Sequence, residues 1–241
     1  MEKKESKRSE MGLGYGSEYQ LLRFLGHHRQ ELESYILKNT NINENLLYHM
    51  EWLDFPKDNT RKSLDGEYTG IGFLPDTLKN KVSNNWKKYW PKKSQNWDAI
   101  LYCSPIVPKS KLEDKWIIVE AKAQLKELDS PCKAESEKSI KQIETAFEAT
   151  QKRFNIKTKD SWLKQYYQLA NRLAFVNFML DNGIQCSLLN IYFLNGWSKK
   201  PENNVLKIGD WKKAIQAEYS YLGINDNDEV KKYISEIFVE C

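Results

Sequence analysis

One apolar segment of this chain ends in two charged side chains, and this combination limits the folds that the chain can adopt. Residues 116–122 read Trp-Ile-Ile-Val-Glu-Ala-Lys, a run typical of a β-strand. Successive side chains of a strand point to opposite faces, so Glu120 and Lys122 share one face and Ala121 lies on the other. Burying a carboxylate and an ammonium is costly unless they pair, bind a metal ion or take part in chemistry. The segment therefore predicts a strand that carries a charged site.

A second strand-like segment precedes this one and contains an aspartate. Residues 97–102 read Trp-Asp-Ala-Ile-Leu-Tyr, and we expect the two segments to form a hairpin with a long connection that contains proline. Asp98 and Glu120 provide two carboxylates, the ligands that Mg²⁺ prefers, and Lys122 can lie beside an attacking water. The pattern predicts hydrolysis of phosphodiester bonds. The alternative is a structural ion pair between Glu120 and Lys122 in an unrelated α/β domain.

The composition suits one globular domain and favours no other chemistry. The chain has 241 residues, 40% of them hydrophobic, so we expect a charged, disordered leader over residues 1–16 and a single domain over 17–241. The cysteines show no zinc-ligand spacing and the histidines form no HExxH motif. No apolar run is long enough for a membrane span, so we expect a cytoplasmic protein without a membrane partner. The net charge of +4 permits a nucleic-acid partner without requiring one.

A capping pattern at Ser17 and Gln20 predicts the first helix, over residues 18–38. Its apolar stripe consists of Leu21, Leu22, Leu25, Leu32, Tyr35 and Ile36. Glu18 lies on that stripe, where it either interacts with the helix dipole near solvent or reaches the charged site as a third acidic group. Arg29 returns to about the same direction and either pairs structurally or contacts phosphate.

Residues 77–97 contain no acidic residue and many lysines. We expect Trp86 and Trp90, four positions apart on a helix, to enter the core. The lysines lead directly to Asp98, so we expect them to neutralise nucleic-acid phosphates. The lysines nearest the charged site are Lys87, Lys88, Lys92 and Lys93.

The remaining sequence predicts two more strands and three more helices. Helices are expected from Ser130-Pro131, from about residue 160 to Gly183, and from a cap at Asp210. The second of these presents Gln168 and Arg172 on a polar face. Residues 187–194 are nearly all apolar, as in a central strand covered on both sides, and residues 234–239 form a final strand. The predicted fold is α/β, with a central mixed sheet flanked by helices.

This order of elements resembles the PD-(D/E)XK nuclease superfamily over residues 17–195. Asp98 matches the motif aspartate, and Glu120 with Lys122 matches its Glu-x-Lys. Glu18 matches the glutamate that many members carry on the first helix, and Gln168 a polar residue on a following helix. Trp97 replaces the usual proline, which does not bear chemistry. The segments around Asp98, Glu120 and Gln168 look still closer to a group of uncharacterised bacterial proteins of the same superfamily.

The resemblance implies a restriction-endonuclease-like core and a metal-dependent nuclease, with DNA as the expected substrate. Asp98, Glu120, the carbonyl of Ala121 and Glu18 would hold Mg²⁺ or Mn²⁺. Lys122 would orient water or stabilise charge on the phosphate. Gln168 would complete the catalytic set, and Arg172 would join the lysines in contacting nucleic acid. A catalytically inactive nucleic-acid- or protein-binding module on the same fold is the alternative.

Overall fold

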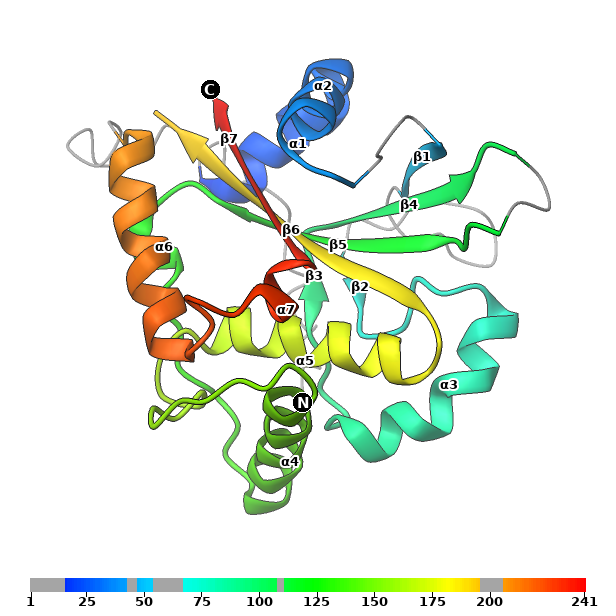
Figure 1. The fold of residues 1–241 in the computed structure, drawn as a ribbon, viewed down its shortest axis with the longest axis vertical. Coiled ribbons are helices and arrows are strands. Elements are labelled where there is room, and N and C mark those ends of the chain that lie inside the picture. The colour runs from blue at the N-terminus through cyan, green and yellow to red at the C-terminus, as the bar shows by residue number, and fades with distance from the viewer. Residues whose placement is uncertain (1–15, 43–46, 54–66, 108–110, 196–205) are drawn as a thin grey trace, which may run out of the picture.

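A five-stranded sheet in the order β1-β4-β5-β6-β7 forms the centre of the molecule (Figure 1). The computed structural model describes residues 16–42, 47–53, 67–107, 111–195 and 206–241. The strands are β1 (Tyr48–Leu53), β4 (Ala99–Pro105), β5 (Lys115–Lys122), β6 (Gln185–Leu194) and β7 (Ile234–Glu240). β1, β4 and β5 pair antiparallel, whereas β6 and β7 extend the sheet parallel to β5. The predicted α/β class, with a mixed sheet flanked by helices, is confirmed.

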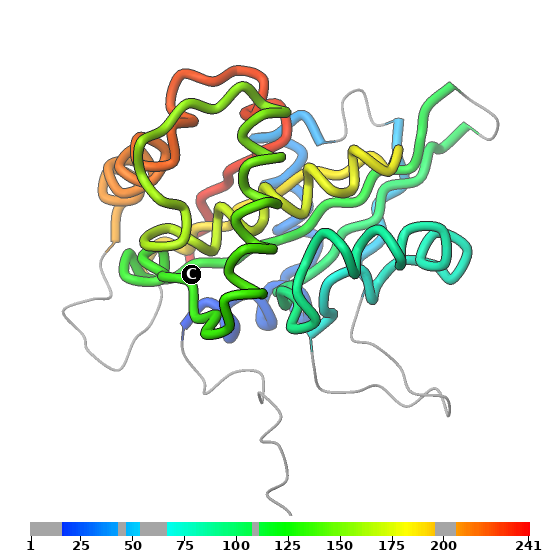
Figure 2. Tube along the Cα trace, turned by 90° about the horizontal axis from the view of Figure 1, so that it is seen from below, coloured from blue at the N-terminus to red at the C-terminus, as the bar shows by residue number. Residues whose placement is uncertain are grey.

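Helices cover both faces of this sheet. On one face, α1 (Ser17–His27) and α2 (Arg29–Asn39) pack over alternate β5 residues such as Ile117 and Val119. The other face is covered by α3 (Asp76–Tyr89), α4 (Glu137–Arg153), α5 (Tyr167–Asp181) and α6 (Ile208–Leu222). Figure 2 shows α3, α4 and α5 in front of the strands, with α1 and α2 behind. β5 and β6 are therefore buried on both faces, which explains their nearly continuous apolar sequences.

Short elements complete the fold around the ends of the strands. β2 (Tyr68–Thr69) and β3 (Asn96–Trp97) form a separate two-stranded ladder just before Asp98. A 3₁₀ turn, η2 (Leu125–Glu127), follows β5, and α7 (Asp228–Lys231) precedes β7. Trp86 and Trp90 lie in the core, as predicted. None of the helices in the described ranges has both the length and the apolar character needed to cross a membrane.

The prediction of one continuous first helix is wrong, because the structure has two helices in this region. His28 leaves the helical conformation, with φ −127° and ψ 29°, so α1 ends at His27 and α2 begins at Arg29. Glycine and histidine at positions 26–28 have poor helix propensity, which favours a break there. The predicted shared direction of Glu18 and Arg29 does not survive this break, and the Arg29 Nε donates to the Leu25 carbonyl at 3.0 Å.

Three further helix starts were predicted too early or at the wrong cap. α4 begins at Glu137, where the Ser136 hydroxyl accepts from the Ser139 N–H, rather than at residue 131. α5 begins after Tyr166, whose left-handed φ of 54° prevents an earlier start. α6 begins at Ile208, and Asp210 accepts from the Lys207 N–H within its first turn. The predicted leader lies outside the described residues, except for Gly16.

Gly223 ends α6 and thereby fixes the helix that reaches over β6. Its φ is 73°, and a Cβ there would lie 2.6 Å from the Lys157 carbonyl oxygen. We expect Gly223→Ala to lower the free energy of unfolding by about 2 kcal/mol in urea denaturation. The control is Gly209→Ala in the first turn of α6, where a Cβ would meet no atom within 4 Å. This control should be neutral or stabilise by roughly 0.5 kcal/mol, and equal midpoints for the two variants would contradict the assignment.

Candidate functional site

A row of polar residues crosses the sheet on the face covered by α5 and α6. Glu120 of β5 is opposite Asn190 of β6, and Asn190 is opposite Glu236 of β7. The register of β4 and β5 ends with Ala99 opposite Val119, and Asp98 lies in a bend just before Ala99. Strand alternation puts the side chains of Glu120, Asn190 and Glu236 on one face. Asp98 lies close enough to Glu120 and Lys122 for their charges to act on its pKa, and the nuclease hypothesis requires this proximity.

Asp98 stands immediately before β4 and is tied to the backbone of β5. Its Oδ2 accepts a hydrogen bond from the Ala121 N–H at 2.8 Å. Burial raises the pKa of Asp98 to about 7, and the negative charge of Glu120 also raises it. The positive charges of Lys122 and Arg172 act in the opposite direction. An aspartate that shares its surroundings with a second carboxylate is poised to bind either a proton or a cation.

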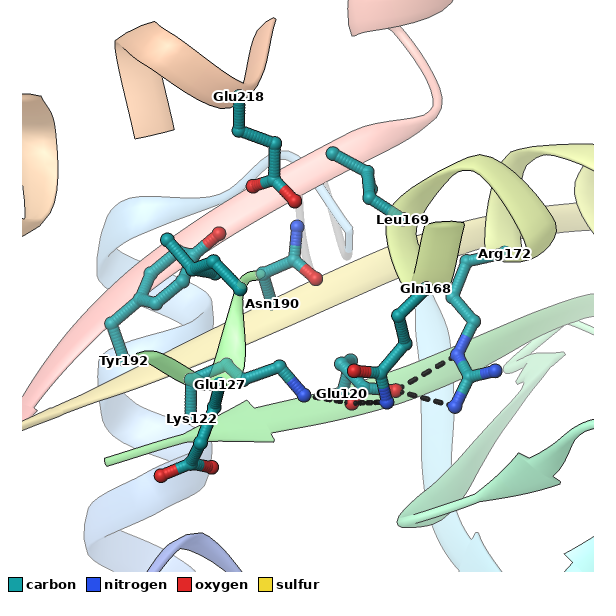
Figure 3. A pocket seen from close by; sticks show the side chains of 10 residues that line it. Glu120, Lys122, Glu127, Gln168, Leu169, Arg172, Asn190, Tyr192 and Glu218 are labelled. Atoms are coloured by element: carbon teal, nitrogen blue, oxygen red, sulfur yellow. Dashed lines mark hydrogen bonds and ion pairs between the residues drawn. The ribbon is translucent and has the colours of Figure 1, made fainter. Parts of the chain in front are cut away.

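Glu120 is the most heavily engaged side chain of the site (Figure 3). Its Oε1 accepts from Lys122 Nζ and from Gln168 Nε2, the latter at 2.5 Å. Its Oε2 accepts from the Arg172 guanidinium at 2.7 and 2.8 Å. Burial alone would raise the pKa of Glu120, but the positive charges of Arg172 and Lys122 outweigh it and lower the pKa. Glu120 is therefore an ionised carboxylate in a site where it is 4% exposed.

Lys122 is the buried cation of the site, with 7% of its surface exposed. Burial alone would lower its pKa, but the negative charges of Glu120 and Asp98 raise it. The ammonium therefore stays protonated at neutral pH. Its position beside both carboxylates agrees with the arrangement that the sequence predicts.

Gln168 and Arg172 reach Glu120 from α5, because residues four apart share one face of a helix. Arg172 also donates to the Asn96 carbonyl at 2.8 Å and lies 4.8 Å from the centre of the Trp97 ring. The predicted contact of Arg172 with nucleic acid is not favoured by this placement. Arg172 is 5% exposed, and its guanidinium is directed at Glu120 rather than at solvent.

Glu18 lies in the first turn of α1 and is exposed. Its negative charge contributes to the raised pKa of Glu67. It is not among the main influences on the pKa of Asp98 or of Glu120. Glu31 and Glu33 do not take its place, because Glu31 pairs with His28 and Glu33 accepts from Trp52 Nε1. Glu18 therefore lies at the margin of the site.

Glu67 and Glu127 are acidic residues near the site that the sequence analysis did not identify. Glu67 lies just before β2, and burial raises its pKa. Its side chain is hydrogen-bonded to Asn96 and senses the charges of Glu18, Glu120 and Arg172. Burial also raises the pKa of Glu127, in η2, which senses Lys122. Glu67 lies in a segment without periodicity, so no sequence signal distinguished it. Glu127 follows Lys122 by only five positions, and this short spacing is a sequence signal that could have identified it.

The four predicted nucleic-acid-binding lysines lie together at the C-terminal end of α3 and in the turn that follows. Lys87, Lys88, Lys92 and Lys93 are all exposed. Gln142 of α4 donates to the carbonyls of Lys87 and Lys88, which fixes this segment against α4. The neighbouring tryptophans are buried, so the segment presents charge without the aromatic surface on which bases stack.

The donor set fits a hard divalent cation only in part. Asp98 and Glu120 offer carboxylate oxygens near each other, beside the backbone of Ala121. A cation bound there would compete with Lys122 and Arg172 for the oxygens of Glu120. Among the described residues, no group of three or more His, Cys, Asp or Glu side chains is arranged to hold a metal ion.

Comparison with known proteins identifies no relative of this chain. No family model, no curated protein and no solved structure matches this chain. The chemistry of the site is therefore argued from its own geometry.

Arg172 should be a major source of stability because it neutralises a buried carboxylate. We expect Arg172→Ala to lower the free energy of unfolding by about 3 kcal/mol, since Glu120 would lose one of its two charged partners. Arg153→Ala is the matched control, because Arg153 pairs with Asp181 at the surface, with side chains 35% and 49% exposed. The control should cost less than about 1 kcal/mol. Chemical denaturation of both variants at pH 7 measures the difference, and equal losses would show that the Glu120 network contributes little.

The raised pKa of Asp98 predicts how stability changes with pH. Between about pH 4 and pH 7 the folded state retains a proton that the unfolded state releases, so the free energy of unfolding falls as the pH rises. Asp98→Asn stays neutral and should remove this loss, which makes the variant more stable by about 2 kcal/mol at pH 8. Urea denaturation from pH 4 to pH 8 in the presence of a chelator tests this. Parallel curves for the two proteins would show that Asp98 has an ordinary pKa.

Proposed function

We propose that the protein is a metal-dependent nuclease that hydrolyses phosphodiester bonds, with DNA as the expected substrate. The observation that carries this proposal is the proximity of Asp98 to Glu120 and Lys122, with Lys122 hydrogen-bonded to Glu120. The order of helix, three antiparallel strands, helix and parallel strand supports a restriction-endonuclease-like core. It also supports the resemblance to PD-(D/E)XK nucleases.

Mg²⁺ or Mn²⁺ is the cofactor that these residues suit. Asp98, Glu120 and the carbonyl of Ala121 would hold the ion. Glu67, which senses the charges of both Glu18 and Glu120, links Glu18 to this site as a further carboxylate. When bound, such an ion would acidify a coordinated water and neutralise charge on the phosphate.

The protein's own side chains divide the remaining work. Lys122 orients the attacking water or donates to a phosphate oxygen on which charge develops. Gln168 and Arg172 hold the carboxylate of Glu120 in place. Lys87, Lys88, Lys92 and Lys93 neutralise backbone phosphates and hold the substrate near the sheet.

A catalytically inactive nucleic-acid- or protein-binding module is the second candidate. It is favoured by one observation, namely that both oxygens of Glu120 already have protein partners. In such a module the charged residues would serve only as a buried ion network. The two candidates differ in whether a divalent ion displaces part of this network.

Lys122→Ala separates these functions. Cleavage of linear and circular DNA and of RNA is measured with Mg²⁺ or Mn²⁺, and binding of Mn²⁺ is measured by calorimetry. The variant keeps both carboxylates, so we expect Mn²⁺ to bind at least as tightly while cleavage falls by on the order of 10²-fold. Lys126→Ala is the control, because Lys126 is exposed in the turn after β5 and should not affect cleavage.

The wild-type protein provides the outcomes that contradict the proposal. If it binds nucleic acid but no divalent ion stimulates cleavage, the binding module is supported. If it neither cleaves nor binds nucleic acid and takes up no Mn²⁺, the charged residues are a structural ion network.

A further inference from the structure

A small cavity adjoins the polar row on the β6 side of Glu120. Its volume is about 20 Å³, and its polar lining comes chiefly from Glu120, Lys122, Gln168, Asn190 and Glu218 (Figure 3). A cavity of roughly 10–15 Å³ or more, measured in the same way, holds one water molecule if two to four polar groups bind it. The cavity therefore has the size and lining for a single water.

Asn190 directs a buried donor into this cavity. Asn190 is 4% exposed, and its Nδ2 has no hydrogen-bond partner among the described residues. Figure 3 shows this amide nitrogen pointing toward the carboxyl group of Glu218, which descends from α6. An unsatisfied buried donor costs about 1–3 kcal/mol, so a group that bridges the amide to Glu218 would be strongly favoured.

Glu218 is a buried acid that the proposed reaction leaves without a role. It is 3% exposed, and burial raises its pKa to about 8, while the positive charge of Lys122 acts in the opposite direction. Glu218 therefore senses the charge of Lys122, and both side chains line the same cavity. A divalent ion held by Asp98 and Glu120 would draw away the two nearest negative charges from Lys122. Glu127 would then be the remaining acidic group that acts on the ammonium, and the Glu218 carboxyl, protonated at neutral pH, would act only through hydrogen bonds.

We infer that the cavity holds one water molecule, bound by the Asn190 amide and the Glu218 carboxyl, and that these two residues position the Lys122 ammonium through it. Glu218 and Asn190 are thus positioning residues, since they act on substrate only through Lys122. The positioning role rests on the proposed nuclease function, whereas the bound water does not.

The bound water is tested by stability, without any measurement of activity. Unfolding is measured for Asn190→Leu, Glu218→Leu and the double variant. If a water bridges the two side chains, Asn190→Leu should shift the unfolding equilibrium toward the unfolded state by about tenfold. The double variant should then cost at least about fivefold less than the product of the single effects. If the cavity is dry, Asn190→Leu should instead stabilise the folded state, because leucine would replace an unsatisfied donor with apolar packing. Such a stabilisation would overturn the inference. Effects of the two single variants that simply multiply in the double variant would also overturn it.

The positioning role is tested by kinetics in two backgrounds. We expect Glu218→Leu to lower kcat by about tenfold with little change in KM, and Glu218→Gln to recover most of the loss because its amide can still bind the water. In the Lys122→Ala background, Glu218→Leu should have no further effect, because its only route to the reaction is gone. Glu148→Leu, at an exposed glutamate of α4, is the control and should leave kcat unchanged.

Three outcomes would overturn the positioning role. One is an equal loss from Glu218→Leu in the wild-type and Lys122→Ala backgrounds, which would indicate a general structural effect. Another is an unchanged kcat in the Glu218→Leu protein. The third is a wild-type protein that cleaves no nucleic acid, which would remove the positioning role along with the proposed function, while the stability cycle would still decide whether the water is bound.

Discussion

The carboxylate of Glu120 is the charge around which the fold is organised. A carboxylate that is 4% exposed is stable only if cations and donors surround it, and these come from two different elements. Lys122 comes from β5 itself, and Gln168 and Arg172 come from α5. The direction and height of α5 over the sheet are thus fixed by electrostatics as well as by apolar packing. Arg172 extends the constraint to the segment before β4 through its bond to the Asn96 carbonyl.

The same network makes catalytic and structural roles hard to separate. An ionised Glu120 suits a hard cation, yet it is also what holds Lys122 protonated and Arg172 buried. A divalent ion carries twice the charge of either partner, so its binding would require these side chains to be displaced from the oxygens of Glu120 at least in part. The incoming charge would then substitute for contacts that already exist.

Sequence patterns predicted the strands and the central charges well, because both follow from period-two alternation and from the cost of buried charge. The strand from 187 to 194 and the shared face of Glu120 and Lys122 needed no tertiary information. Helix starts were less predictable, since Tyr166 adopts a left-handed conformation that only the surrounding structure can impose. Glu67 and Glu218 could not be found, because their roles depend on long-range proximity. Asn190 is visible in the sequence as the polar residue inside an apolar strand.

The polar row also has a consequence for when the site comes into existence. The contacts that complete its surroundings join distant parts of the chain: Arg172 meets Glu120 across 52 positions and Asn96 across 76. Contacts between residues so distant in sequence form late in folding, because long loops must close first. A chain emerging from the ribosome therefore carries Asp98, Glu120 and Lys122 for some time before α5 and β6 can complete their surroundings. The surroundings of these charged residues are therefore complete only after most of the chain has been synthesised.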